Sequence, residues 1–228
     1  PHIGAQLPVT GIAAIAAPLR SPDSSHLHFM ATFNEIQLLR TTYLRGPSVW
    51  TYRPVLEVWL DLGELEDYPS NKIPGLNDRL TAWLPDLVEH HCGVGERGGF
   101  LLRLQEGTWM GHVLEHVIIE LLNLSGMPAE FGQTREISRR GVYRMVFRCP
   151  EEAVGRVAVE HGHRLLMAAI NDEAFDLKAA IHAIKTAIND RYLGPSTGCI
   201  VDAAGARRVP HIRLNDGNLV QLGYGAAQ

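Results

Sequence analysis

The sequence predicts an α/β fold of the α+β kind, in which long helices cover a small β-sheet. Residues 55–62 and 142–148 alternate apolar and polar side chains, which is typical of strands with one buried face. Residues 108–124, 150–170 and 173–188 carry apolar side chains at helical spacing. With 228 residues, of which 46% are hydrophobic, the chain can bury a core of this size.

The first predicted strand covers residues 33–44 and is joined to the second by a turn at residues 45–48, where glycine and proline are adjacent. A helical pattern follows over residues 76–90. Pro85 must bend or break this helix, because proline lacks the amide hydrogen that a helix interior requires. A glycine-rich loop, residues 92–99, comes next.

The long helices have recognisable ends in the sequence. Thr108 is placed to cap the first of them, which ends near residue 124, because Gly126 and Pro128 follow it. Pro150 occupies the first-turn position of the next helix. We expect these two helices to pack side by side on the sheet.

Three parts are expected along the chain. Residues 1–29 are rich in Pro, Ala, Ser and His and are predicted to be an extension that is disordered or not native. Residues 30–192 form the main domain. Residues 193–228, with predicted strands at 211–214 and 219–222, read as the incomplete start of a second α/β unit.

Composition excludes several classes of function. A net charge of −4 and a pI near 6.3 argue against a dedicated nucleic-acid binder. Cys92, Cys149 and Cys199 are far apart and odd in number, which indicates reduced thiols rather than a disulfide scaffold. No apolar run approaches the roughly 20 residues that span a bilayer. We therefore expect a cytoplasmic protein with neither nucleic-acid nor membrane partners.

The segment from His112 to His116 carries the clearest chemical signal. Two imidazoles four residues apart lie on one helix face, and Glu115 stands between them. This is the H-x-x-E-H order of the inverzincin peptidases, in which the histidines bind zinc. Zinc would activate a water molecule, with Glu115 as general base in the hydrolysis of a peptide or isopeptide bond. The alternative is a helix whose histidines only pack or form hydrogen bonds, because the chain has 11 histidines.

A catalytic zinc normally takes three protein ligands, so a third must come from elsewhere. Glu120 lies about 12 Å along the helix axis from the first histidine and cannot join it on one ion. We choose Glu160, which sits among apolar residues of the following helix and should face the core. The rivals are His161, His163 and Cys149. Alternatively, Glu160 is a solvated residue paired with an arginine one turn on.

Several segments resemble the amino-terminal domain of the cyanophycin synthetases. They follow one another at family-like spacing over most of residues 36–150. They are residues 44–50, 69–75, 87–92, 97–100, 107–112, 115–116, 126–128 and 131–136. Residues 194–197 and 213–225 resemble the opening of that family's ATP-grasp ligase domain.

This resemblance implies that the complete enzyme uses ATP and magnesium to build a polymer with an aspartate backbone and arginine side chains, and we expect it to be a homo-oligomer. The amino-terminal region is implied to hold the polymer. In some members it cuts the polymer into primers at a metallopeptidase-like site similar to that of pitrilysin and insulysin. The alternative is a non-catalytic docking or assembly domain with a vestigial metal site.

A basic stretch follows the motif helix and contains Arg135, Arg139, Arg140 and Arg144. Guanidinium groups bind carboxylates through paired hydrogen bonds, so these side chains are candidates for holding the polymer. The other interpretation is a solvated loop and an exposed strand face.

Overall fold

The structure is a computed structural model that describes residues 32–93, 95–191 and 193–225. The chain divides into two units, residues 1–30 and 31–228, and every element named below belongs to the second. The extension expected over residues 1–29 lies outside the described residues.

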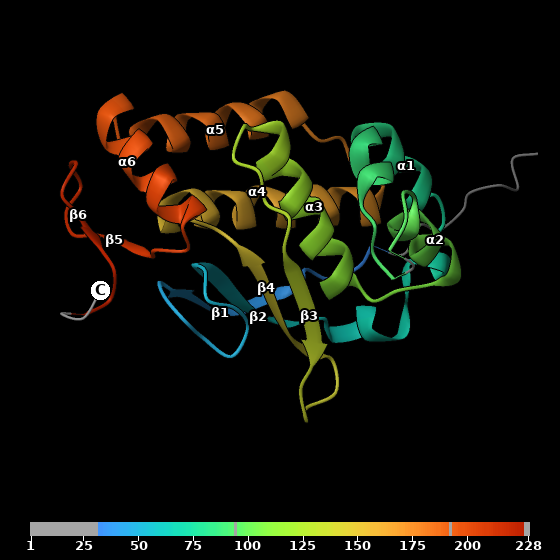
Figure 1. Cartoon of the computed structure of the whole chain (residues 1–228). Helices are drawn as coiled ribbons and strands as arrows, with labels where there is room; N and C mark the ends of the chain where they lie inside the picture. Colours follow the sequence, from blue (N-terminus) through green and yellow to red (C-terminus); the bar gives the residue numbers. More distant parts are fainter. Residues whose placement is uncertain (1–31, 94, 192, 226–228) are drawn as a thin grey trace, which may run out of the picture. The chain divides into compact units, whose positions relative to one another are not determined.

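The second unit mixes helices and strands (Figure 1). The strands are β1 (Gln37–Leu44), β2 (Val55–Asp61), β3 (Gly132–Glu136), β4 (Val142–Arg148), β5 (His211–Arg213) and β6 (Val220–Leu222). The α-helices are α1 (Leu76–Trp83), α2 (Gly99–Glu106), α3 (Met110–Leu124), α4 (Glu152–Asn171), α5 (Leu177–Asp190) and α6 (Pro195–Ala206). Short 3₁₀ helices are η1 (Gly63–Asp67), η2 (Ser70–Lys72) and η3 (Pro85–Glu89).

The main sheet is small and antiparallel, with the strand order β1-β2-β4-β3. Both predicted central strands are present, but the expectation that each has a single buried face is wrong, because Val55 and Glu57 of β2 and Val142 and Val146 of β4 are buried on the other face. Core side chains come from one face of both strands: Leu56, Val58 and Leu60 of β2, and Tyr143, Met145 and Phe147 of β4. The prediction of a mixed fold with a small sheet is therefore correct.

Helices α3 and α4 contact each other, as expected, and α3 also contacts β3 and β4. Helix α5 lies against α4, on the side away from the main sheet (Figure 1). The close approach of α3 and α4 depends on Gly162, since an added Cβ there would lie 2.6 Å from Cγ1 of Ile118. The contact between the two long helices thus depends on a position where a methyl group would force the Ile118 side chain to move.

Some predicted boundaries moved. Pro85 does break the expected helix, because α1 ends at Trp83 and η3 begins at the proline. The prediction that Thr108 caps the motif helix is wrong: the N-cap residue is Trp109, and the Thr108 side chain contacts His112 instead. Pro150 lies outside α4, whose N-cap is Glu151.

The last predicted helix begins later than expected. Helix α5 starts at Leu177, after Asp176, whose side chain accepts a hydrogen bond from the Ala179 amide. The strands predicted at residues 211–214 and 219–222 are present as the short antiparallel pair β5 and β6, and helix α6 precedes them. A domain boundary near residue 193 remains a prediction.

We predict that Gly162→Ala destabilises the protein, because the new methyl group must displace the stiff, β-branched Ile118 side chain. The matched control is Gly198→Ala in α6, where an added Cβ meets nothing within 4 Å. Alanine favours a helix over glycine at both positions by up to about 1 kcal/mol, so the difference between the variants isolates the clash.

Urea unfolding should show Gly162→Ala to be about 1–3 kcal/mol less stable than the control variant. Equal stabilities would mean that α3 and α4 can separate without cost.

Candidate metal centre

Helix α3 positions the H-x-x-E-H motif in the protein interior. Almost every residue from Met110 to Leu122 is buried, including Glu115 and His116, while His112 is half-buried. One helical turn brings the two histidines onto the same face, as the sequence predicted. Their Nε2 atoms are 3.1 Å apart, and the ring planes are at 82° to each other.

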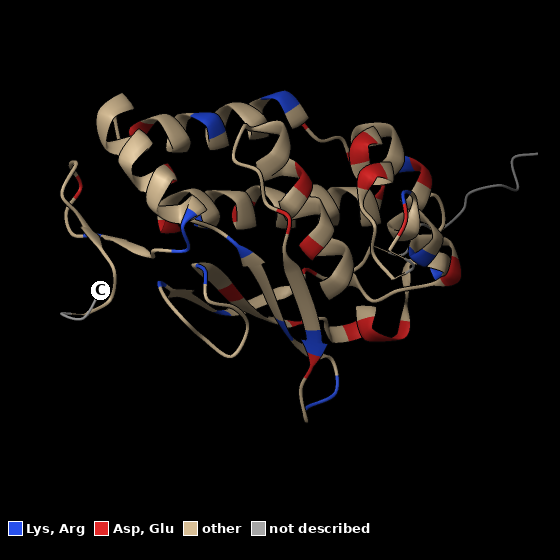
Figure 2. Cartoon of the chain, viewed as in Figure 1, with Lys and Arg blue, Asp and Glu red and all other residues tan. Residues whose placement is uncertain are grey.

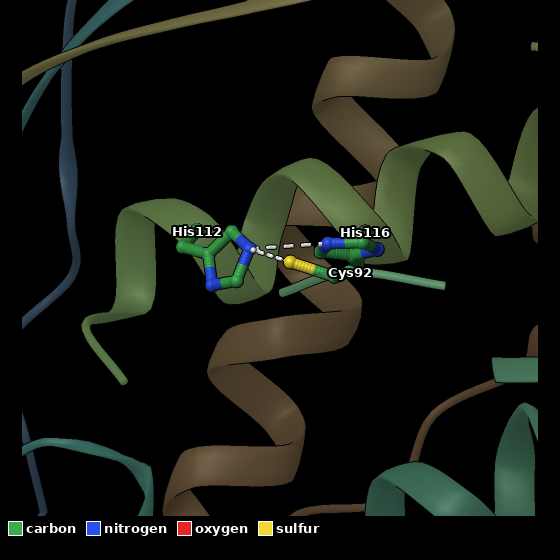
Figure 3. A group of neighbouring side chains, drawn as sticks. All are labelled: Cys92, His112 and His116. Carbon is green, nitrogen blue, oxygen red and sulfur yellow. Dashed lines mark hydrogen bonds between the residues drawn. The ribbon is translucent and has the colours of Figure 1, made fainter. Parts of the chain in front are cut away.

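A thiol completes this group. Cys92 lies in the loop between η3 and α2, and its Sγ atom is 3.1 Å from Nε2 of His112. Figure 3 shows the Cys92, His112 and His116 side chains pointing toward one another. Their ligand atoms all lie within 4.8 Å of one another, which suits a single metal ion. Imidazole and thiolate are ligands that zinc prefers, so the chemistry of this donor set fits the ion that the motif predicts.

Glu160 is not part of this group. The expectation that it faces the core is wrong, because its side chain is exposed. Gly162, only two residues later, is the position of α4 that faces Ile118 of α3. Two residues correspond to a rotation of about 200° around a helix, so Glu160 points away from the contact with α3.

The three alternative candidates for the third ligand, Cys149, His161 and His163, do not belong to the described metal group either. Cys149 is buried, and its thiol contacts the Glu151 carbonyl. His163 forms a hydrogen bond of 2.8 Å with the Ile36 carbonyl. His161 is half-buried on α4 and does not belong to the group.

Burial keeps both motif imidazoles neutral. Burial, together with the charge of Arg103, lowers the pKa of His112 to about 4. Burial and the neighbouring His112 and His90 lower the pKa of His116 to about 2. Neutral imidazoles can offer a nitrogen lone pair to a metal ion near pH 7. For Cys92, burial and the charge of Glu115 raise the pKa of the thiol, so an ion must displace a proton there.

Glu115 is held beside the group by the edge strand β3. The Thr134 hydroxyl donates a hydrogen bond of 2.6 Å to its Oε2 atom. An added Cβ at Gly132 would lie 2.5 Å from Oε1, so only glycine leaves room for the carboxylate. Burial raises the pKa of Glu115 to about 7, against the opposing effect of the Thr134 hydrogen bond. A pKa near neutrality suits a general base.

Two hollows meet at these residues. One has a volume of about 760 Å³ and is lined by Asp86, Glu120 and Glu130, among others. The other has a volume of about 410 Å³ and is lined by Arg103 and Arg135, among others. Cys92, Glu115 and Gly132 line both hollows. The motif carboxylate therefore lies where the two hollows meet.

The four arginines of the predicted basic stretch lie in different surroundings in the structure. Arg135 on β3 lines the smaller hollow and lies over the Trp50 ring. Arg139 and Arg140, in the β3–β4 hairpin, form ion pairs with Asp61 and Asp67.

Figure 2 shows this basic hairpin and the acidic η1 segment. The fourth arginine, Arg144, forms an ion pair with the buried Glu57 and lies over the rings of Trp50 and Trp59. Of the four arginines, only Arg135 lines either hollow.

Sequence reasoning missed Cys92, Thr134, Gly132 and Arg103. A signal for Cys92 existed in the sequence, because it directly follows His90 and His91 and stands at the start of a glycine-rich loop. Strand β3 has the polar sequence GQTRE, which shows no apolar alternation. Its two site residues could not be found by that criterion.

The structure is thus a domain with a candidate metal centre. An antiparallel sheet is covered by a helix that offers two imidazoles and a carboxylate, and a nearby loop adds a thiol. The family model described as the cyanophycin synthase-like N-terminal domain matches residues 57–171. The chain belongs to the cyanophycin synthetase family.

Curated relatives agree with this assignment. A cyanophycin synthetase from Crocosphaera subtropica is 42% identical over 198 residues, which cover 85% of this chain and 23% of the relative. One from Geminocystis herdmanii is 43% identical over 198 residues, with the same coverage. The chain thus spans about a quarter of the length of these relatives. In the described part of the chain, no helix is long and apolar enough to cross a membrane.

We predict that the purified chain binds about one zinc ion. Three variants, Cys92→Ala, His112→Ala and His116→Ala, should each weaken zinc binding by more than about 100-fold. The reason is that losing a ligand costs more affinity than losing a residue that only contacts a ligand. Elemental analysis and competition with a chelator measure this. Glu160→Gln is the matched control and should bind zinc like the wild type. Loss of zinc in this control alone would restore the original choice of ligand.

A second prediction concerns Glu115 in the zinc-free protein. Because folding raises its pKa from 4.5 to about 7, the folded state holds the proton more tightly than the unfolded chain does. The stabilising contribution is complete below the unfolded pKa and is lost as pH rises through the folded pKa.

We expect Glu115→Gln to remove this dependence. The unfolding free energy of the variant relative to wild type should rise by about 2–3 kcal/mol between about pH 5 and about pH 8, as measured by urea unfolding with a chelator present. The histidine contributions are common to both proteins and cancel. A difference that does not change with pH would show that folding leaves the Glu115 pKa unchanged.

Proposed function

We propose that this domain binds the aspartate-arginine polymer cyanophycin and cuts it hydrolytically into primers at a metal centre formed by Cys92, His112 and His116. The observation that carries this proposal is the convergence of three uncharged ligand groups within 4.8 Å, next to a carboxyl group whose pKa is about 7. The relatives are named cyanophycin synthetases, which supplies the polymer as the natural substrate class.

A zinc ion in such a site supplies a Lewis acid, which activates water and polarises a carbonyl group. The protein's own contribution comes chiefly from Glu115. Its carboxylate takes a proton from the attacking water and gives it to the leaving nitrogen as the C–N bond breaks. Thr134 and Gly132 keep the carboxylate in place, since one donates a hydrogen bond to it and the other leaves space for it.

The hollows beside the centre support a polymer that carries both charges. Arg103 and Arg135 line the smaller hollow and can bind carboxylates of the substrate. Asp86 and Glu130 line the larger hollow and can attract guanidinium groups. Arg139, Arg140 and Arg144 already pair with acidic side chains, so we propose Arg135 as the substrate contact among the four predicted arginines.

A second candidate is a non-catalytic docking or assembly domain. Its support is the β1–β2 loop, where the side chains of Val49 and Tyr52 are 87% and 83% exposed. Exposed apolar side chains that lie together in one loop can form a contact surface for another protein. In this case the metal centre would be vestigial.

We also propose that residues 193–228 begin the ATP-dependent ligase region implied by the family resemblance. Helix α6 and the β5–β6 pair would then be its first elements. Magnesium and ATP would act in that region and not at the centre on α3.

The deciding experiment is cleavage of purified cyanophycin by the zinc-loaded chain. We predict that Glu115→Gln lowers the cleavage rate by about 10²–10⁴-fold, the usual contribution of a general base, while zinc content and polymer binding persist. Gly132→Ala should also lower the rate, because its methyl group displaces the Glu115 carboxylate without removing it.

The exposed Glu160→Gln variant is the control and should cleave at the wild-type rate. New amino ends, counted by a fluorogenic reagent, report each cut. If wild type and Glu115→Gln release new ends equally slowly while both bind polymer, the domain is a docking module.

A further inference from the structure

Behind His116, on the side away from His112 and Cys92, lie two polar residues that the mechanism above does not use. Glu120 is buried, and its Oε2 atom is 2.9 Å from Nε2 of His90. The Nδ1 atom of His90 is 2.7 Å from Nδ1 of His116. The two ring nitrogens of His90 therefore connect a buried carboxylate to a metal-binding histidine.

We infer that Glu120 and His90 are positioning residues that hold His116 in the tautomer whose Nε2 atom can bind a metal ion. The inference rests on the metal centre proposed above and adds two residues to it. Glu120 is not among the residues whose ligand atoms converge, but it is one turn beyond His116 on the same helix face. His90 bridges the remaining gap.

The proton positions follow from the donors and acceptors. An ionised carboxylate only accepts hydrogen bonds, so His90 must donate from Nε2 to Glu120. When His90 is neutral, its single N–H group is the one that faces Glu120, which leaves Nδ1 as an acceptor. His116 must then donate from Nδ1, and its Nε2 atom retains a lone pair. That atom is the one 3.1 Å from Nε2 of His112.

The reverse order of donors would block the site. If His90 accepted at Nε2 and donated at Nδ1, then His116 would accept at Nδ1 and carry its proton on Nε2. That proton would point at His112 and occupy the space that the ion needs. The carboxylate of Glu120 selects against this arrangement. Outer partners of metal-binding histidines commonly act in this way.

Packing keeps the His116 ring from leaving this orientation. The Phe100 ring stacks on it with a centroid distance of 4.0 Å and an angle of 23° between planes. His90 cannot serve as a ligand of the same ion, because Glu120 and His116 engage both of its nitrogens. The role left to His90 is orientation.

The test compares Glu120→Gln with Glu89→Gln. Both variants remove one carboxylate that lines the larger hollow, but Glu89 is exposed and pairs with Arg97. Zinc affinity is measured by chelator competition, and the visible spectrum of the Co²⁺-loaded chain reports the ligand geometry. We expect Glu120→Gln to bind zinc about 10–100-fold more weakly and to alter the cobalt spectrum. Glu89→Gln should match the wild type in both measurements.

A double-mutant cycle tests whether the two residues act as one unit. His90→Ala should weaken zinc binding by a factor similar to that of Glu120→Gln, and combining the changes should add little. Unfolding free energies with a chelator present identify any loss that comes from a damaged fold. The isosteric Glu120→Gln variant carries the test even if His90→Ala does not fold.

The outcomes separate this inference from the proposed function. If wild type binds zinc and Glu120→Gln binds it as tightly as Glu89→Gln does, the inference is overturned and the metal centre stands. Independent, multiplicative losses from His90→Ala and Glu120→Gln would also overturn it, because the residues would then act separately. If wild type binds neither zinc nor cobalt, the metal centre fails and the inference fails with it.

Discussion

Helix α3 brings imidazoles and carboxylates into the interior, where a polar group without a partner costs several kcal/mol. Each of these polar side chains has a hydrogen-bond partner on a neighbouring segment. Glu115 accepts from Thr134, Glu120 contacts His90, and Thr108 contacts His112. These partners come from an edge strand, from the loop after η3 and from the residues before α3, so the surrounding elements are arranged around the polar face of one helix.

This arrangement also explains why small residues stand at the close contacts. Gly162 lets α4 approach the apolar side of α3, and Gly132 lets β3 approach its polar side. On both sides of α3, a neighbouring backbone therefore lies so close to an α3 side chain that no Cβ fits between them. The geometry of the centre depends on this packing as much as on the identities of its ligands.

Much of the fold could be predicted from local patterns. Both central strands are present, Pro85 ends a helix, and the motif lies inside a long helix with its histidines on one face. These features depend on neighbours in the sequence, which a single chain displays. The family resemblance added the order of the segments, and the family model and the relatives confirm it.

The remainder required contacts between distant segments. Cys92 is 20 residues from His112, and no spacing rule connects them. The apolar neighbours of Glu160 predict a core position, but helix rotation puts its side chain on the exposed side of α4. Strand β3 is an edge strand of polar residues, held by pairing with β4 and by contact with α3 rather than by its own pattern.

The proposed metal ligands come from two separate segments, the loop before α2 and helix α3, and this affects the entropy of the unfolded chain. An ion bound by Cys92 and His112 cross-links positions 20 residues apart and closes a loop that contains α2. By analogy with a disulfide that closes a loop of similar length, such a cross-link restricts the unfolded chain and is worth about 3 kcal/mol. The ion would then stabilise the position of α2 in addition to its chemical role. Removing the ion would make the segment that contains α2 lose rigidity first.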